Sequence, residues 1–119
     1  MVQYSQAHLD ASFAALADVT RRNVLEQLGR ADASITDLAV KFDMTLTGMI
    51  KHVGVLEQAG LVTTEKVGRV RTCRLDRRGL TAAAAWIEKH RQLWEARFAE
   101  LDTVIADLKR KDTVNGRRK

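Results

Sequence analysis

The sequence predicts a mainly α-helical domain that carries one small β-hairpin. Apolar residues recur every three or four positions in short segments before Gly60 and in one long segment after residue 80. Between these parts, residues 61–75 are rich in β-branched side chains and contain a central glycine, Gly68. The chain contains no proline, so caps and glycines have to mark where each element begins and ends.

The composition is that of a soluble globular protein with one modest core. The chain has 119 residues, of which 45% are hydrophobic and 29% are charged, and this size fits one domain, expected over residues 1–111. The longest apolar runs are too short to cross a bilayer, and the first ten residues lack a signal-peptide core. The single cysteine, Cys73, allows no intrachain disulfide. We therefore expect a cytoplasmic protein with no membrane partner.

Positive charge is concentrated in two places along the chain. The net charge is +5 and the pI is about 9.8, which favours an anionic partner. Between Lys66 and Arg78 there are six basic residues and one acid, Asp76. Further basic residues follow at the end of the chain, where residues 112–119 are expected to form a flexible tail.

Two amphipathic helices are predicted at the start of the chain. Leu9, Phe13 and Leu16 recur at intervals of four and three residues, which indicates a first helix. Asp18 is then placed to cap a second helix, which ends near Gly29.

The next two helices form a helix-turn-helix over residues 34–59. Ser34 and Asp37 resemble a capping box that opens the third helix. Thr45 is placed to cap the fourth helix, and Gly60 suits its C′ position. A short helix, a brief turn and a second helix in this order are typical of DNA-binding proteins.

A β-hairpin and one long helix complete the predicted fold. Residues 61–75 form the hairpin, with Gly68 supplying a positive φ in its turn. Asp76 caps the last helix, which is expected over residues 80–109. Apolar residues repeat in it every seven positions, namely Ile87, Trp94, Leu101 and Leu108. Together the elements make a winged helix-turn-helix with long N- and C-terminal helices.

The outward face of the fourth helix is a candidate DNA-reading surface. The first residues of such a helix meet base edges in the major groove. Hydroxyl and ammonium groups suit phosphates and bases, whereas aliphatic side chains suit a thymine methyl group. The alternative is an ordinary solvated helix face. The candidate contacts on this helix are Thr45, Leu46, Thr47, Ile50 and Lys51.

The hairpin supplies a second candidate DNA contact. Arg69 and Arg71 alternate along one strand and project from the same face, close to Lys66. Guanidinium groups there suit phosphates or a narrow minor groove. The alternative is that these charges only protect an edge strand from aggregation. Because the hairpin directly follows the candidate reading helix, we favour DNA binding.

Several segments resemble the ArsR family of winged-helix repressors from bacteria and archaea. They are residues 13–22, 35–39, 51–62 and the pair Gly68-Arg69 with Arg74-Leu75, and the run KHVGVLEQAGLV at 51–62 is the most specific of them. The C-terminal segment is similar to the non-metal branch related to autorepressors of small operons. The sequence departs from the family pattern at Val19, where proline is common, and at residues 46–50, which replace a Ser/Pro-rich stretch.

The resemblance implies a homodimeric repressor that binds a palindromic DNA operator until a signal releases it. It adds Arg21 and His52 to the candidate DNA contacts, although His52 also suits local packing. It places the dimer interface on the first and last helices, with the candidates Leu9, Phe13, Trp86, Ile87, His90, Trp94, Leu101, Val104, Ile105 and Leu108.

No cofactor, metal ion or enzymatic activity is expected. The third helix carries no cysteine, and Cys73, His8, His52 and His90 are scattered over different elements, whereas a zinc-type site needs three or four ligands together. No nucleophile lies beside a positioned base. Cys73, between two arginines, leaves redox sensing open beside the simpler interpretation of a half-buried strand residue.

The sequence is compatible with two functions from different classes. The first is the dimeric repressor of double-stranded DNA. The second is a protein-interaction module that docks a partner through its last helix without reading DNA. For the repressor, release by an unidentified small-molecule effector, by a partner, by cysteine oxidation or by falling concentration are the alternatives.

Overall fold

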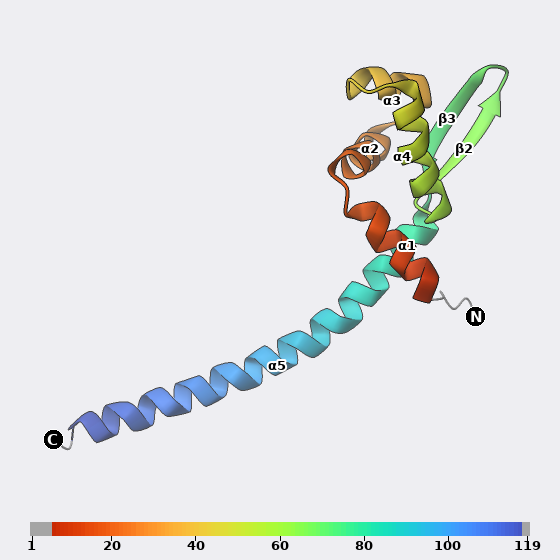
Figure 1. Cartoon of the computed structure of the whole chain (residues 1–119). Coiled ribbons are helices and arrows are strands. Elements are labelled where there is room, and N and C mark those ends of the chain that lie inside the picture. Colours follow the sequence, from red (N-terminus) through yellow and green to blue (C-terminus); the bar gives the residue numbers. More distant parts are fainter. Residues whose placement is uncertain (1–5, 118–119) are drawn as a thin grey trace. The chain divides into compact units, whose positions relative to one another are not determined.

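The computed structural model describes residues 6–117, and side chains as far as residue 113. The chain divides into two units, Met1–Ala84 and Ala85–Lys119. Five helices and three short strands are present in the described part, in the order α1, α2, β1, α3, α4, β2, β3, α5 (Figure 1). The mainly helical fold with a small sheet that the sequence predicts is thus confirmed. No helix of the described residues is both long and apolar enough to cross a membrane.

The first two helices are α1 (Gln6–Leu16) and α2 (Val19–Arg30). Asp18 caps α2 as predicted, because its carboxylate accepts a hydrogen bond of 3.0 Å from the Arg21 N–H. The buried face of α1 is lined by small residues, Ser12 and Ala15, and not by the Leu9–Phe13 pair that the periodicity favours.

Helices α3 (Ile35–Lys41) and α4 (Leu46–Gln58) form the predicted helix-turn-helix. The side chain of Ser34 caps α3, and the side chain of Thr45 caps α4. Between them the chain turns at Asp43, whose φ of +52° is in the left-handed region, where aspartate is tolerated better than most residues. The C′ residue of α4 is Gly60, with a φ of +74°, as the sequence predicts.

The core of the first unit lies where α2, α3 and α4 meet the sheet. Helix α4 contacts α1, α2, α3 and β2, so it is held from several sides. It contributes three fully buried side chains, Met49, Val53 and Leu56. The other large buried side chains include Val24, Leu38, Leu61 and Val62. A helix fixed in this way presents its opposite face in one defined orientation.

The sheet has one strand more than the predicted hairpin. Strands β2 (Val62–Val67) and β3 (Val70–Leu75) form the hairpin, and β1 (Ala33–Ser34) pairs antiparallel with β3, which gives the order β1-β3-β2. Ala33 lies opposite Cys73 in this pairing. A strand of two residues shows no alternation of apolar and polar side chains, so the sequence pattern does not reveal it.

Helix α5 (Arg77–Arg117) is longer than the predicted segment 80–109. It begins directly after its cap, Asp76, whose carboxylate accepts the Arg78 N–H at 2.9 Å. The expected flexible tail, residues 112–119, is helical as far as Arg117, and residues 118–119 lie outside the described part. No proline interrupts this segment, so nothing in it forces the helix to stop at the last apolar repeat.

Candidate nucleic-acid interface

The outward face of α4 carries two exposed aliphatic side chains. Leu46 is 49% exposed and Ile50 is 47% exposed, one helical turn apart on the same face. Thr45, Thr47 and Lys51 are also exposed. The hydroxyl oxygen of Thr45 is already engaged in the cap, because it accepts the Gly48 N–H at 3.1 Å; its own O–H still has a proton to donate.

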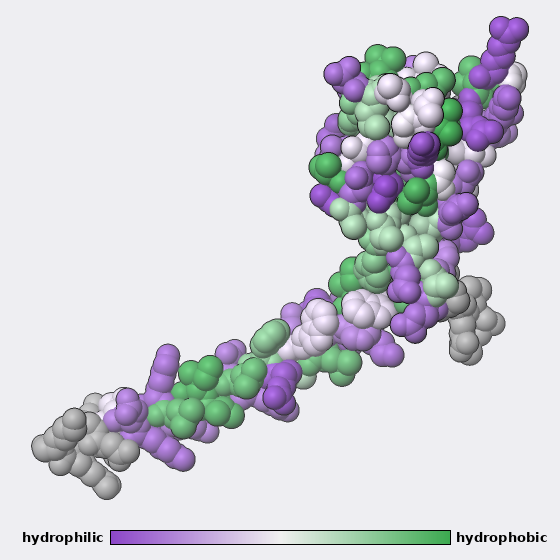
Figure 2. All heavy atoms as spheres, in the orientation of Figure 1, coloured by the Kyte–Doolittle hydropathy of each residue, from purple (hydrophilic) through white to green (hydrophobic). Residues whose placement is uncertain are grey.

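An open cleft of about 380 Å³ separates α4 from the hairpin. Its lining brings together five of the predicted DNA contacts, from both elements: Leu46, Ile50, Lys66, Arg69 and Arg71. Figure 2 shows hydrophilic side chains gathered at the end of this unit where the hairpin projects. The cleft therefore combines an aliphatic wall with a cationic one.

The cations of the cleft are not engaged in ion pairs with other described residues. Within the described residues, Lys66, Arg69 and Arg71 form no ion pair with a carboxylate. Arg74, by contrast, lies 3.0 Å from Asp32 and 3.6 Å from Glu65. Of the four basic residues of the hairpin, Arg74 is thus paired with acids at the surface, whereas the other three line the cleft without an ion pair to any residue of the described part.

The turn of the hairpin places Arg69 at its tip. Val67 and Val70 are opposite each other, so Gly68 and Arg69 form a two-residue turn, and Gly68 has a φ of +64°. Glycine at the first central position is typical of a type II′ turn. Arg69 therefore belongs to the turn and not to the strand that the sequence predicts, whereas Arg71 lies in β3.

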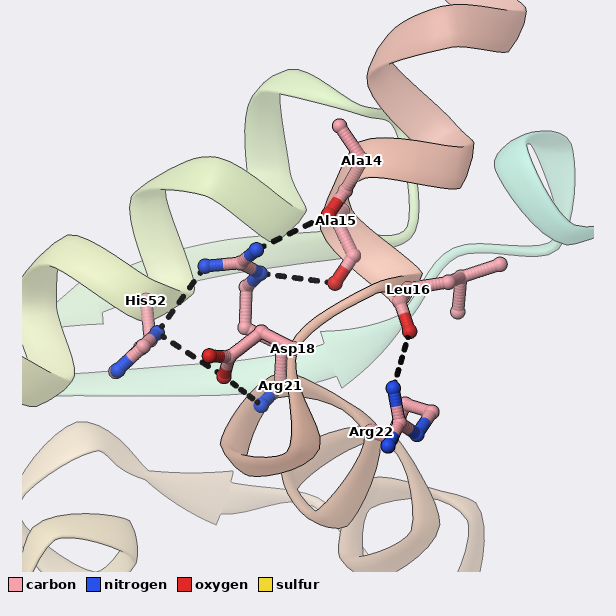
Figure 3. A network of polar contacts seen from close by, with 7 residues as sticks. All are labelled: Ala14, Ala15, Leu16, Asp18, Arg21, Arg22 and His52. Atoms are coloured by element: carbon pink, nitrogen blue, oxygen red, sulfur yellow. Dashed lines mark hydrogen bonds and ion pairs between the residues drawn. The ribbon is translucent and has the colours of Figure 1, made fainter.

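Two predicted DNA contacts, Arg21 and His52, belong to an internal network instead of the cleft (Figure 3). The Arg21 guanidinium donates to the carbonyls of Ala15 at 2.8 Å and Ala14 at 3.0 Å, which lie in the last turn of α1. His52 Nδ1 lies 3.4 Å from Arg21 Nη1 and 3.7 Å from the Asp18 carboxylate. The backbone N–H of Arg21 holds the pKa of Asp18 below its usual value of 3.8. The network joins α1, α2 and α4.

The cleft is also lined by residues that the sequence analysis does not single out. Ile35 and Thr36, at the start of α3, line it together with the predicted contacts. Ile35 is 6% exposed, so Thr36 offers the accessible hydroxyl. Thr36 lies two residues after the Ser34 cap, between the buried Ile35 and Leu38. This position is the signal that could have identified an outward-facing residue at this helix end.

Cys73 is a core residue. Its side chain is fully buried in β3. Burial, together with the charge of Glu57, raises the pKa of the thiol to about 11. The two flanking arginines that made a reactive thiolate conceivable do not outweigh this desolvation. Cys73 is therefore poorly suited to redox sensing.

The predicted dimer residues fall on two elements. In the first unit, Leu9 and Phe13 of α1 are half-buried. In the second unit, Figure 2 shows hydrophobic patches along α5. The large apolar side chains of this part of the helix are between 37% and 61% exposed. They are Trp86, Ile87, Leu93, Trp94, Phe98, Leu101, Val104, Ile105 and Leu108.

His90 lies among the aromatic residues of α5. Its ring stacks on Trp86 at a centroid distance of 3.9 Å, and its Nδ1–H donates to the Trp86 carbonyl at 2.8 Å. Trp94 is edge-on to Trp86. Within the described residues, no group of three or more His, Cys, Asp or Glu side chains is arranged to hold a metal ion.

Comparison with known proteins assigns the fold and the family. A family model described as a helix-turn-helix domain matches residues 16–65. The HTH-type transcriptional regulator YuzN of Bacillus subtilis is 37% identical over 87 residues, which are 66% of this chain and 95% of that protein.

Two solved structures agree with this assignment. The crystal structure of an ArsR family transcriptional regulator is 45% identical, with a TM-score of 0.72, and the match covers 80% of this chain and 97% of the other. An ArsR-like transcriptional regulator from Rhodococcus sp. RHA1 is 36% identical, with a TM-score of 0.70, and the match covers 82% and 92% of the two chains. The chain belongs to the ArsR family of winged helix-turn-helix transcriptional regulators.

Proposed function

We propose that the protein is a homodimeric transcriptional repressor that binds a palindromic operator in double-stranded DNA. The observation that carries the proposal is the cleft between α4 and the hairpin. There the exposed face of the reading helix meets Lys66, Arg69 and Arg71, which form no ion pair with a described carboxylate. Uncompensated cations beside an outward-facing helix suit the phosphates that border a major groove.

In this proposal α4 enters the major groove and the hairpin follows the flanking phosphates. Thr45, Thr47 and Lys51 are the polar readers at the start of α4, all of them exposed. Arg69 at the turn has the reach and the planar donor group for a phosphate or a narrow minor groove. Residues 34–59 thus recognise the base sequence of the operator. Residues 61–75 add affinity and fix the position of the protein along the DNA.

Dimerisation through α5 accounts for the exposed apolar residues of the second unit. Side chains such as Trp94 and Leu101 are 53% and 41% exposed in the single chain, and a contiguous apolar surface of this kind marks an interface. The seven-residue repeat suits pairing with the same helix of a second copy. Two copies related by a two-fold axis would present their α4 helices to half-sites about one helical turn apart.

Repression follows if the operator overlaps the promoter, because a bound dimer then excludes the polymerase. Release by an effector that alters the dimer, or by falling protein concentration, is compatible with this arrangement. The buried Cys73 makes release by thiol oxidation the least favoured of the routes.

The test is binding to the DNA upstream of the protein's own gene, measured by fluorescence anisotropy over a range of salt concentrations. Each subunit has four cations that would contact phosphates: Lys51, Lys66, Arg69 and Arg71. A dimer would therefore release the counterions of about eight phosphates. A plot of the logarithm of the binding constant against the logarithm of the salt concentration should then have a slope of about −7. Equal affinity for the upstream DNA and for a random duplex, or a salt slope near zero, would contradict the proposal. Analytical ultracentrifugation and the symmetry of a footprint test the dimer separately.

A double substitution separates this proposal from a protein-interaction module, which the exposed apolar face of α5 also favours. Lys51→Ala with Arg69→Ala should abolish operator binding and regulation in cells. Arg30→Ala with Lys41→Ala removes the same charge outside both the cleft and α5 and serves as the control. Regulation that survives the first pair intact would favour the interaction module.

A further inference from the structure

We infer that the protein recognises its operator in part through the 5-methyl groups of thymine, which Leu46 and Ile50 contact in the major groove. This inference rests on the proposed DNA-binding function and specifies what the reading helix selects. It assigns to the two aliphatic side chains a role in specificity, beside the cations that provide affinity.

The burial pattern of α4 sets these two residues apart. Met49, Val53 and Leu56 fill the core, and their side chains account for the apolar face that the fold requires. Leu46 and Ile50 are about half exposed on another face and line the cleft. The fold does not need large aliphatic groups there, and their exposure to water is unfavourable until a partner covers them.

The chemistry of the major groove offers one natural partner for them. The edges of the bases present hydrogen-bond donors and acceptors, and the thymine methyl is the apolar exception. An aliphatic side chain pressed against a polar base edge would strip water from it without supplying a hydrogen bond, which is unfavourable. Against a thymine methyl the same side chain buries apolar surface on both partners. Leu46 and Ile50 therefore discriminate for thymine and against cytosine.

The geometry fits contact with two neighbouring positions of one half-site. Residues four apart on a helix rise by about 6 Å along its axis, which is comparable to one or two base steps of about 3.4 Å. Lys66, Arg69 and Arg71 on the opposite wall of the cleft are placed to hold the phosphates of the same segment. The cations thus fix the register in which the aliphatic groups meet the bases.

Replacement of single thymines by deoxyuridine in the operator tests the inference, because it removes only the methyl group. The operator is the segment protected in a footprint of the upstream DNA. Each contacted methyl should contribute about fourfold in affinity, so we expect one or two sensitive thymines in each half-site. Where cytosine replaces a sensitive thymine, 5-methylcytosine should recover about fourfold relative to cytosine.

Substitutions in the protein link the effect to the two residues. Leu46→Ala and Ile50→Ala should each remove the sensitivity to deoxyuridine at one position and leave the other. Val55→Ala is the matched control, since Val55 is also an aliphatic residue of α4, 40% exposed, and is absent from the cleft lining. Circular dichroism of each variant establishes that it is folded.

The outcomes separate this inference from the proposed function. Specific binding to the operator that tolerates deoxyuridine at every position would overturn the inference and leave the repressor proposal standing. If Leu46→Ala and Ile50→Ala both remain as sensitive to deoxyuridine as the wild type, the assignment of the methyl contacts to Leu46 and Ile50 is overturned. A protein with no preference for any duplex would contradict the proposed function, and the inference with it.

Discussion

The backbone N–H of Gly79 donates a hydrogen bond of 2.9 Å to the carbonyl of Gly60. This bond joins the first turn of α5 to the end of the reading helix α4. The Asp76 N–H donates to the Leu61 carbonyl, also at 2.9 Å, and the Ser12 hydroxyl donates to the Ala59 carbonyl at 3.3 Å. The C-terminal end of the reading helix is therefore fixed by both α1 and the start of α5.

Gly79→Ala should destabilise the protein by about 1–3 kcal/mol, because an added methyl group has no room. A Cβ on Gly79 would lie 2.5 Å from the Gly60 carbonyl oxygen and 2.7 Å from its carbon. Both atoms belong to the backbone, so they cannot rotate away. The measurement is urea unfolding at a fixed protein concentration.

Gly54→Ala is the matched control for that substitution. Gly54 lies inside α4, and a Cβ there would meet no described atom within 4 Å. Alanine should stabilise the helix by about 0.5–1 kcal/mol. Equal effects of the two substitutions on the free energy of unfolding would show that the close approach of Gly79 to Gly60 has no energetic weight.

Arg21→Ala should lower stability without changing the salt dependence of DNA binding. The guanidinium of Arg21 donates to the Ala14 and Ala15 carbonyls, and the loss of these hydrogen bonds should cost about 1 kcal/mol. Arg69→Ala should instead weaken DNA binding without lowering stability, since Arg69 faces the cleft at an exposed turn. It should leave unfolding unchanged and reduce the salt slope by about 2 for a dimer. A reduced salt slope for Arg21→Ala would restore Arg21 to the DNA contacts.

The cap residues show how far the sequence predicts this fold. Asp18, Ser34 and Thr45 each accept a backbone N–H at the start of the helix that they were expected to open. Capping is a local interaction between residues two or three apart, so it can be recognised in one sequence. The positive φ of Gly60 and Gly68 is local in the same sense.

The parts that the sequence does not predict depend on contacts between distant segments. Strand β1 exists because Ala33 meets Cys73, and its two residues carry no pattern of their own. The sequence alone does not distinguish an arginine that binds DNA from one that donates hydrogen bonds to helix carbonyls. Arg21 has the second role because the last turn of α1 lies next to it in the fold. The candidate cleft was predicted better than this network, because periodicity along α4 fixes which of its side chains face outward, and the hairpin that follows α4 carries the cations.

Cys73 should not react with thiol reagents in the folded protein. Its side chain is fully buried and its thiol pKa is about 11, so almost no thiolate exists near neutral pH. We expect slow reaction with Ellman's reagent until urea unfolds the chain, after which one thiol reacts for each chain. Operator binding should also withstand mild oxidation with hydrogen peroxide. Rapid labelling of the native protein would show that Cys73 is accessible, and thiol oxidation would then again be a candidate signal for release from the operator.

Asp76 should contribute to stability in a way that depends on pH. Its carboxylate is 8% exposed and accepts the Arg78 N–H at 2.9 Å and the Arg78 Nη2 donor at 2.7 Å. The side-chain hydrogen bond from Arg78 is the main cause that holds the pKa of Asp76 below 3.8, although burial opposes it. Asp76→Ala removes the cap of α5 and should cost about 1–2 kcal/mol at neutral pH.

The pH dependence has a defined sign, since the folded pKa lies below the unfolded value of 3.8. The contribution of the charged carboxylate is complete above that value and declines as the pH falls through the lowered pKa. Asp76→Asn keeps an oxygen for the Arg78 N–H but has no titrating group. Urea unfolding from about pH 7 down to about pH 2.5 should therefore show the wild type losing its advantage over Asp76→Asn at the acid end. A difference between these two proteins that stays constant across that range would show that the ion pair with Arg78 does not stabilise the start of α5.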